Sequence, residues 1–67
     1  MKISYDPKYD LLYIKFSEGF HQVETKRLSD DIAIDFDEAG KIAGIEILSA
    51  SKYLDLASLL PIGFDVP

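Results

Sequence analysis

The chain has 67 residues, a formal net charge of −5 and no cysteine. This length leaves room for a single domain over residues 1–67 and for no separate catalytic domain. The acidic balance disfavours direct nucleic-acid or membrane binding, because nucleic acids and anionic membrane surfaces attract basic proteins. No apolar run approaches the ~20 residues of a membrane span and no apolar signal region follows Met1, so we expect a cytoplasmic protein.

The first part of the chain predicts three short strands. We expect strands over residues 2–5 and 11–16, separated by a turn at Asp6-Pro7-Lys8, where aspartate and proline both favour turn geometry. Alternation in the second strand places Leu12, Ile14 and Phe16 on one face. Residues 21–27 have a strand-like but polar pattern, which is typical of an edge strand or an irregular connection.

The most informative stretch is residues 30–48, which predicts a tight antiparallel hairpin because both arms alternate around a turn that ends in glycine. The residues that share a parity are Ile32, Ile34 and Phe36 in the first arm and Ala43, Ile45 and Ile47 in the second. We expect these apolar sets to lie on a buried face, with acidic residues on the other.

Two registers of this hairpin are possible. A four-residue loop ending at Gly40 pairs Ile34 with Ala43 and places Glu46 on the outer face, opposite Asp31. A three-residue loop with a glycine bulge at Gly40 would instead bring Glu46 onto the isoleucine face. Because burial of an unpaired carboxylate is costly, the first register is favoured.

The C-terminal part predicts one helix over about residues 50–60, capped by Ser49-Ala50-Ser51 and ended by Pro61, followed by an apolar tail over residues 61–67. The fold class is therefore α+β. We expect a small, mostly antiparallel sheet over about residues 1–48, a meander of about five strands, with the C-terminal helix packed on one face.

One short helix cannot cover both faces of such a sheet, and exposed apolar patches mark interaction sites. We therefore expect a homodimer whose interface includes the apolar residues of the helix and tail. These candidates are Leu56, Leu59, Leu60, Ile62 and Phe64. The alternative is that the tail folds back over the core.

The order of these motifs resembles the small bacterial and archaeal family catalogued as domain of unknown function 2283. The resemblance covers about residues 1–53 and is carried by residues 5–10 (YDPKYD), 11–16 (LLYIKF), 32–41 (IAIDFDEAGK), 42–48 (IAGIEIL) and Ala50-Ser51. The family has no established catalytic residues, substrate or cofactor. The resemblance implies a compact cytoplasmic domain and, more loosely, a small neighbouring protein partner, as in a toxin–antitoxin pair.

The acidic residues Asp31, Asp35 and Glu46 are the one constellation that suggests chemistry, because carboxylates on one sheet face can share magnesium, calcium or manganese. The alternative is a solvated face that keeps the sheet soluble. His21 has no acidic or cysteine partner at motif spacing, and no serine lies in a nucleophile elbow.

We therefore expect no catalytic residue and no cofactor. The sequence favours a non-enzymatic, self-associating protein–protein interaction module. The alternatives are a divalent-cation-binding protein or small metal-dependent enzyme that uses the acidic face, and an antitoxin-like partner of a small basic protein.

Overall fold

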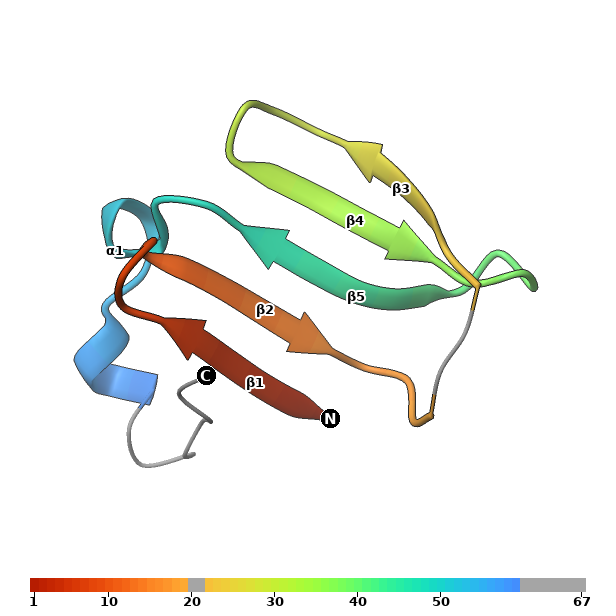
Figure 1. The fold of residues 1–67 in the computed structure, drawn as a ribbon, viewed down its shortest axis with the longest axis horizontal. Coiled ribbons are helices and arrows are strands. Elements are labelled where there is room, and N and C mark those ends of the chain that lie inside the picture. Colours follow the sequence, from red (N-terminus) through yellow and green to blue (C-terminus); the bar gives the residue numbers. More distant parts are fainter. Residues whose placement is uncertain (20–21, 60–67) are drawn as a thin grey trace.

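The computed structural model describes residues 1–19 and 22–59, and these residues form a five-stranded antiparallel sheet with a short helix at one end (Figure 1). The strands are β1 (Lys2–Asp6), β2 (Leu11–Lys15), β3 (Glu24–Arg27), β4 (Ile32–Phe36) and β5 (Ile42–Ile47). Their arrangement confirms the predicted α+β class.

The strands lie in the order β1-β2-β5-β4-β3. The chain first forms the β1–β2 hairpin, then crosses to the far edge of the sheet, where β3, β4 and β5 form a three-stranded meander that returns to β2. The pairing of β2 with β5 joins the two units, so that β1 and β3 are the two edges (Figure 1).

The β4–β5 hairpin has the predicted faces but not the predicted partners. Ile34 lies opposite Ile45 rather than Ala43, so the favoured register is wrong by two residues. The turn is the three-residue alternative: the Asp37 N–H donates to the Lys41 carbonyl at 2.8 Å, and Gly40 adopts a φ of 82°. This positive φ is readily available only to glycine.

An irregularity in β5 explains why the faces are nevertheless as predicted. Phe36 lies opposite Ile42 while Asp35 lies opposite Gly44, which leaves Ala43 as an extra residue. The Ala43 carbonyl accepts the N–H groups of both Phe16 and Ser17, at 2.9 and 3.3 Å. The glycine turn and this bulge each shift the alternation by one residue, so their effects on the faces cancel.

The C-terminal helix is shorter than predicted. Helix α1 (Ala50–Tyr53) begins where expected, but Leu54 is extended (φ −128°, ψ 145°), and a separate 3-10 turn, η1 (Leu56–Leu59), follows. Ser49, expected within the cap, has a left-handed φ of 53° and makes no side-chain cap bond. So short a helix gains little from its own cooperativity and depends on tertiary contacts. The tail over residues 61–67 lies outside the described residues.

Asp10 supplies those contacts from the β1–β2 turn. Its carbonyl accepts the Ala50 N–H at 2.9 Å, and its carboxylate accepts the Ser51 hydroxyl at 2.6 Å and the Tyr5 phenol at 2.7 Å. The hydrogen bonds to the carboxylate, the one from the Ser51 hydroxyl first and then the one from Tyr5, lower the pKa of Asp10. Asp10 thus fixes the start of α1 beside the start of β2.

The core of the described residues is sparse. Leu12 is the largest side chain that is fully buried there, and the other buried apolar residues are Ala33, Ala43 and Ala50. No helix in the described part of the chain is long and apolar enough to cross a membrane.

Candidate interaction surfaces

One face of the sheet is apolar on β1, β2, β5 and β4, and Leu28, directly after β3, extends it. The register places Ile3, Ile14, Ile45 and Ile34 in one row, on β1, β2, β5 and β4. We call this side the isoleucine face; it comprises Ile3, Tyr5, Leu12, Ile14, Phe16, Leu28, Ile32, Ile34, Phe36, Ile42, Ile45 and Ile47.

The isoleucine face remains partly open to solvent. Leu28 is 66% exposed, Ile42 46% and Phe16 42%, and the isoleucines of β1, β2 and β4 are half-buried. Leu28 lies just beyond β3, where its N–H donates to the Ile32 carbonyl at 2.8 Å. Sequence reasoning missed Leu28 because its predicted strand ended at Arg27. The only available signal was the apolar residue directly after a polar strand.

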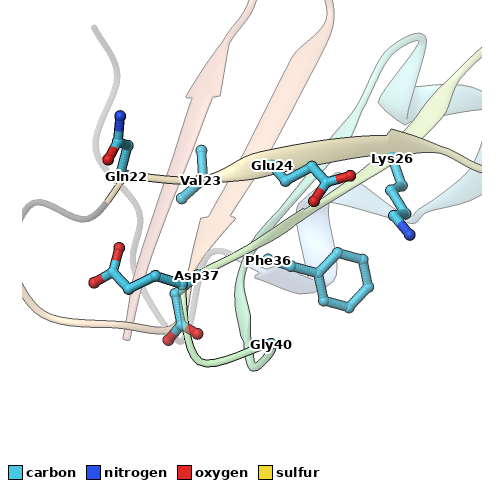
Figure 2. A pocket seen from close by; sticks show the side chains of 8 residues that line it. Gln22, Val23, Glu24, Lys26, Phe36, Asp37 and Gly40 are labelled. Atoms are coloured by element: carbon cyan, nitrogen blue, oxygen red, sulfur yellow. The ribbon is translucent and has the colours of Figure 1, made fainter.

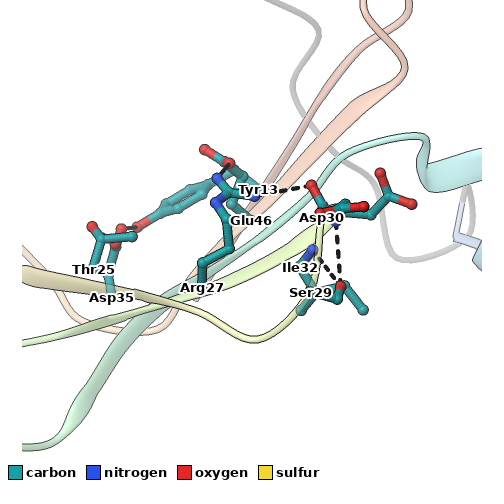
Figure 3. A network of polar contacts seen from close by, with 9 residues as sticks. Tyr13, Thr25, Arg27, Ser29, Asp30, Ile32, Asp35 and Glu46 are labelled. Atoms are coloured by element: carbon teal, nitrogen blue, oxygen red, sulfur yellow. Dashed lines mark hydrogen bonds and ion pairs between the residues drawn. The ribbon is translucent and has the colours of Figure 1, made fainter.

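The opposite side, which we call the polar face, is held by side-chain hydrogen bonds (Figure 3). Tyr13 donates its phenol hydrogen to one oxygen of Asp35 at 2.7 Å, and the Thr25 hydroxyl donates to the other. Arg27 pairs with Glu46 at 3.2 Å and also donates to the Asp30 carbonyl at 3.1 Å. These bonds connect β2, β3, β4 and β5 across the sheet.

Gly44 makes room for this arrangement. A side-chain carbon at Gly44 would overlap the phenol oxygen and ring of Tyr13 and would lie 3.0 Å from the Ile14 carbonyl. Loss of hydration raises the pKa of Tyr13 to about 12, with further contributions from its hydrogen bond to Asp35 and from the charge of Glu46. The phenol therefore acts as a fixed donor and not as a group that exchanges protons near neutral pH.

The structure separates the three predicted cation ligands. Asp31 accepts a hydrogen bond from the Tyr53 hydroxyl, whereas Asp35 is bound by its two donors and Glu46 by Arg27. The expected juxtaposition of Asp31 with Glu46 is wrong, because Glu46 lies opposite Ala33. Within residues 1–19 and 22–59, no three acidic, histidine or cysteine side chains form a group that could hold a metal ion.

Two grooves flank the meander. The larger, of about 650 Å³, lies between the edge strand β3 and the β4–β5 turn, and its lining includes Val23, Glu24, Lys26, Phe36, Asp37 and Gly40 (Figure 2). The Asp37 carboxylate is used by the turn itself, since it accepts the N–H groups of Ala39 and Lys41, both at 2.9 Å. A smaller groove of about 180 Å³ lies beside Tyr13 on the polar face.

Of the five predicted interface residues, Leu56 and Leu59 lie in the described part of the chain. Leu56 is half-buried in η1, and Leu59 ends that turn. Leu60, Ile62 and Phe64 lie outside the described residues.

Comparisons with known proteins match the part of the chain that forms the sheet and the start of α1. A family described as "Protein of unknown function (DUF2283)" matches residues 2–51, which include all five strands and both partners of the Asp10–Ser51 contact. An uncharacterised protein of Methanocaldococcus jannaschii is 48% identical over 56 residues, which cover 84% of this chain and 47% of that protein. The chain therefore spans about half the length of the curated relative that it matches. No solved structure matches it significantly.

Proposed function

Because this chain belongs to the DUF2283 family of proteins of unknown function, a proposal about its role must come from its surfaces, and we propose that it is a non-enzymatic interaction module that self-associates through its isoleucine face. The supporting observation is that the apolar residues of this face come from four strands and from Leu28 beside β3, whereas Leu12 is the one large side chain fully buried in the described residues. A sheet buries its apolar face against a second layer.

The charge distribution favours a second copy as that layer. The chain carries a net charge of −5, yet the charged residues of the strands on the isoleucine side are Glu24 and Lys26, at the β3 edge. Two acidic copies can therefore bring their isoleucine rows together without opposing carboxylates at the centre. Charges kept to the rim of an interface affect specificity and association rate more than affinity.

The size of the face sets the expected strength. Five strands ~4.8 Å apart, with about five residues each at ~3.3 Å, give a face of roughly 24 by 17 Å. The area of such a face, about 400 Å², is small beside the ~800 Å² that each partner buries in a standard interface. We therefore expect a dimer that dissociates on dilution.

The polar face supports the non-enzymatic part of the proposal. Asp35 and Glu46, the acidic residues on its central strands β4 and β5, are engaged by Tyr13, Thr25 and Arg27. A general base or a metal ligand needs a lone pair that is available to substrate or metal. Here each Asp35 oxygen and one Glu46 oxygen already accept hydrogen bonds that link the strands.

Light scattering coupled to size exclusion, over a hundredfold range of concentration, tests the proposal. For chains of 7.5 kDa we expect a mass that rises above the monomer value as concentration increases. The double variant Ile42→Asp/Phe16→Asp should lower the mass at each concentration, because both exposed side chains lie on the isoleucine face.

Tyr9→Asp is the matched control, because Tyr9 is 64% exposed but lies in the β1–β2 turn, outside the strands that form that face. This variant should associate like the wild type. A chain that is monomeric throughout, or a double variant with the wild-type mass, would contradict the proposal.

A further inference from the structure

The outer edge of β3 offers a second surface, distinct from the isoleucine face. All four residues of β3 are exposed, and the strand ends the sheet at the side away from β1 (Figure 1). At the opposite edge, only Lys2 of β1 is exposed and the other four residues are half-buried. An open edge strand presents unpaired N–H and C=O groups to another strand.

The backbone direction of β3 is fixed by its pairing with β4. The Leu28 N–H donates to the Ile32 carbonyl at 2.8 Å, so the even-numbered residues of β3 direct their backbone groups towards β4. Thr25 and Arg27 therefore direct theirs away from the sheet. Another strand could hydrogen-bond to these two residues and to Val23 before them.

The sequence of β3 is complementary to itself when it runs antiparallel. When two β3 strands join their sheets across a twofold axis, residues opposite each other lie on the same face. The axis can pass through residue 24, 25 or 26, and that residue then lies opposite its own copy. Pairing at residue 24 opposes two Glu24 carboxylates, and pairing at residue 26 opposes two Lys26 ammonium groups. Pairing at Thr25 places Glu24 opposite the other copy's Lys26, twice, and uses the outward backbone groups.

We propose that β3 pairs antiparallel with β3 of a second copy, with Thr25 at the twofold axis and Glu24 opposite Lys26. This contact goes beyond the proposed isoleucine-face association and does not require it. It joins two five-stranded sheets into one and places their polar faces on the same side. Because β3 has four residues, the contact is short and reversible.

Disulfide trapping tests both the contact and its register. The chain has no cysteine, so each variant carries one thiol. In a hydrogen-bonded antiparallel pair the Cα atoms are ~5.5 Å apart, within the range that a disulfide spans. Under mild oxidation, Thr25→Cys should form covalent dimers several-fold faster than Lys26→Cys, which tests the alternative register, and Ser4→Cys, which tests the β1 edge.

Charge reversal in the Thr25→Cys background gives a second measurement. Glu24→Lys or Lys26→Glu should slow trapping through the thiol at position 25 several-fold, because each places like charges opposite each other. The combined reversal Glu24→Lys/Lys26→Glu should restore the rate. Trapping of Thr25→Cys should also persist when Ile42→Asp/Phe16→Asp is added, so failure of the isoleucine-face proposal and failure of this one are distinguishable.

The proposal is overturned if Thr25→Cys is trapped at the same rate as Lys26→Cys and Ser4→Cys. It is also overturned if Lys26→Cys or Ser4→Cys is trapped fastest, or if the combined charge reversal remains as slow as the single reversals.

Discussion

On one side of the sheet, four isoleucines lie in a row across four strands and remain half-buried or partly exposed. On the other side, Tyr13 crosses Gly44 to reach Asp35, while Arg27 reaches Glu46. The two faces belong to the same strands and alternate residue by residue, yet they meet their physical requirements differently. On the polar face, Asp35 and Glu46 accept hydrogen bonds from other side chains of the chain, whereas the isoleucine face leaves apolar area exposed to solvent.

This difference separates what holds the monomer together from what it can recognise. Hydrogen bonds of the polar face are specific in direction, and removal of one partner lowers the free energy of unfolding. Burial of the isoleucine face is favourable in proportion to the apolar area removed from water, and this holds for any layer that covers it. Substitutions on the polar face should therefore change the free energy of unfolding, whereas exposed positions of the isoleucine face should change association.

The largest expected effect on stability is that of Gly44→Ala. The new methyl group would overlap the Tyr13 phenol and press against the Ile14 carbonyl, so the ring must leave Asp35 or the strand must shift. Overpacking of this kind costs about 1–3 kcal/mol. Urea unfolding of the wild type and the variant measures the difference.

The double variant Gly44→Ala/Tyr13→Ala identifies the cause. If the ring is the obstacle, Gly44→Ala should cost much less when Tyr13 is already alanine, because effects of residues in contact are not additive. Equal costs in both backgrounds would show that the Ile14 carbonyl, and not the ring, limits the site.

A smaller effect is expected for Tyr13→Phe, which keeps the ring over Gly44 and removes only its hydroxyl. Asp35 would retain the hydrogen bond from Thr25, so we expect a loss of about 1 kcal/mol. The same urea experiment at neutral pH measures it. No loss of stability would mean that water replaces the phenol at Asp35 without cost.

The pH dependence of stability gives Tyr13→Phe a second readout. The pKa of Tyr13 rises from 10.0 to about 12 on folding, so between these values the folded chain holds a proton that the unfolded chain releases. Stability from this group is complete below pH 10 and is lost as the pH rises through 12. Tyr13→Phe should therefore weaken the decline over this window. An unchanged decline would assign it to Tyr5 and Tyr53, whose pKa values are also raised.

The alternation of residues was sufficient to predict the five-stranded sheet and the composition of its faces. Ile32, Ile34, Ile45 and Ile47 share a face in the structure, as the pattern requires. The exact partners could not be predicted, because the Ala43 bulge depends on a carbonyl that binds Phe16 and Ser17, far away in sequence. A pattern of period two detects parity but not a shift of two residues.

The polar side chains were less predictable than the faces for a related reason. Asp35 and Glu46 were recognised as outward, but the donors that bind Asp35 come from β2 and β3, and no local spacing reveals those partners. The end of α1 at Tyr53 was also not predicted, because the contacts that hold this helix come from a distant part of the chain. Its first turn is held by Asp10, 41 residues away from Ser51, and the apolar spacing after Tyr53 is also compatible with the 3-10 turn that forms.

The smallest expected effect is that of Arg27→Met. The Arg27–Glu46 pair spans 3.2 Å, but its side chains are 48% and 36% exposed, so water screens the attraction. Exposed pairs of this kind contribute at most about 1 kcal/mol. Unfolding measured at ~0.01 M and ~1 M salt, where the Debye lengths are ~30 and ~3 Å, should show a loss that shrinks as salt rises.

Lys26→Met is the matched control, since Lys26 is the neighbouring exposed cation on the same strand but lies on the isoleucine side. It should change the monomer's free energy of unfolding less than Arg27→Met does in low salt. If the two variants were equal at both salt concentrations, the ion pair would contribute nothing beyond the general charge of the chain. The polar face would then be held by the hydrogen bonds that Tyr13 and Thr25 donate to Asp35, with no contribution from the Arg27–Glu46 pair.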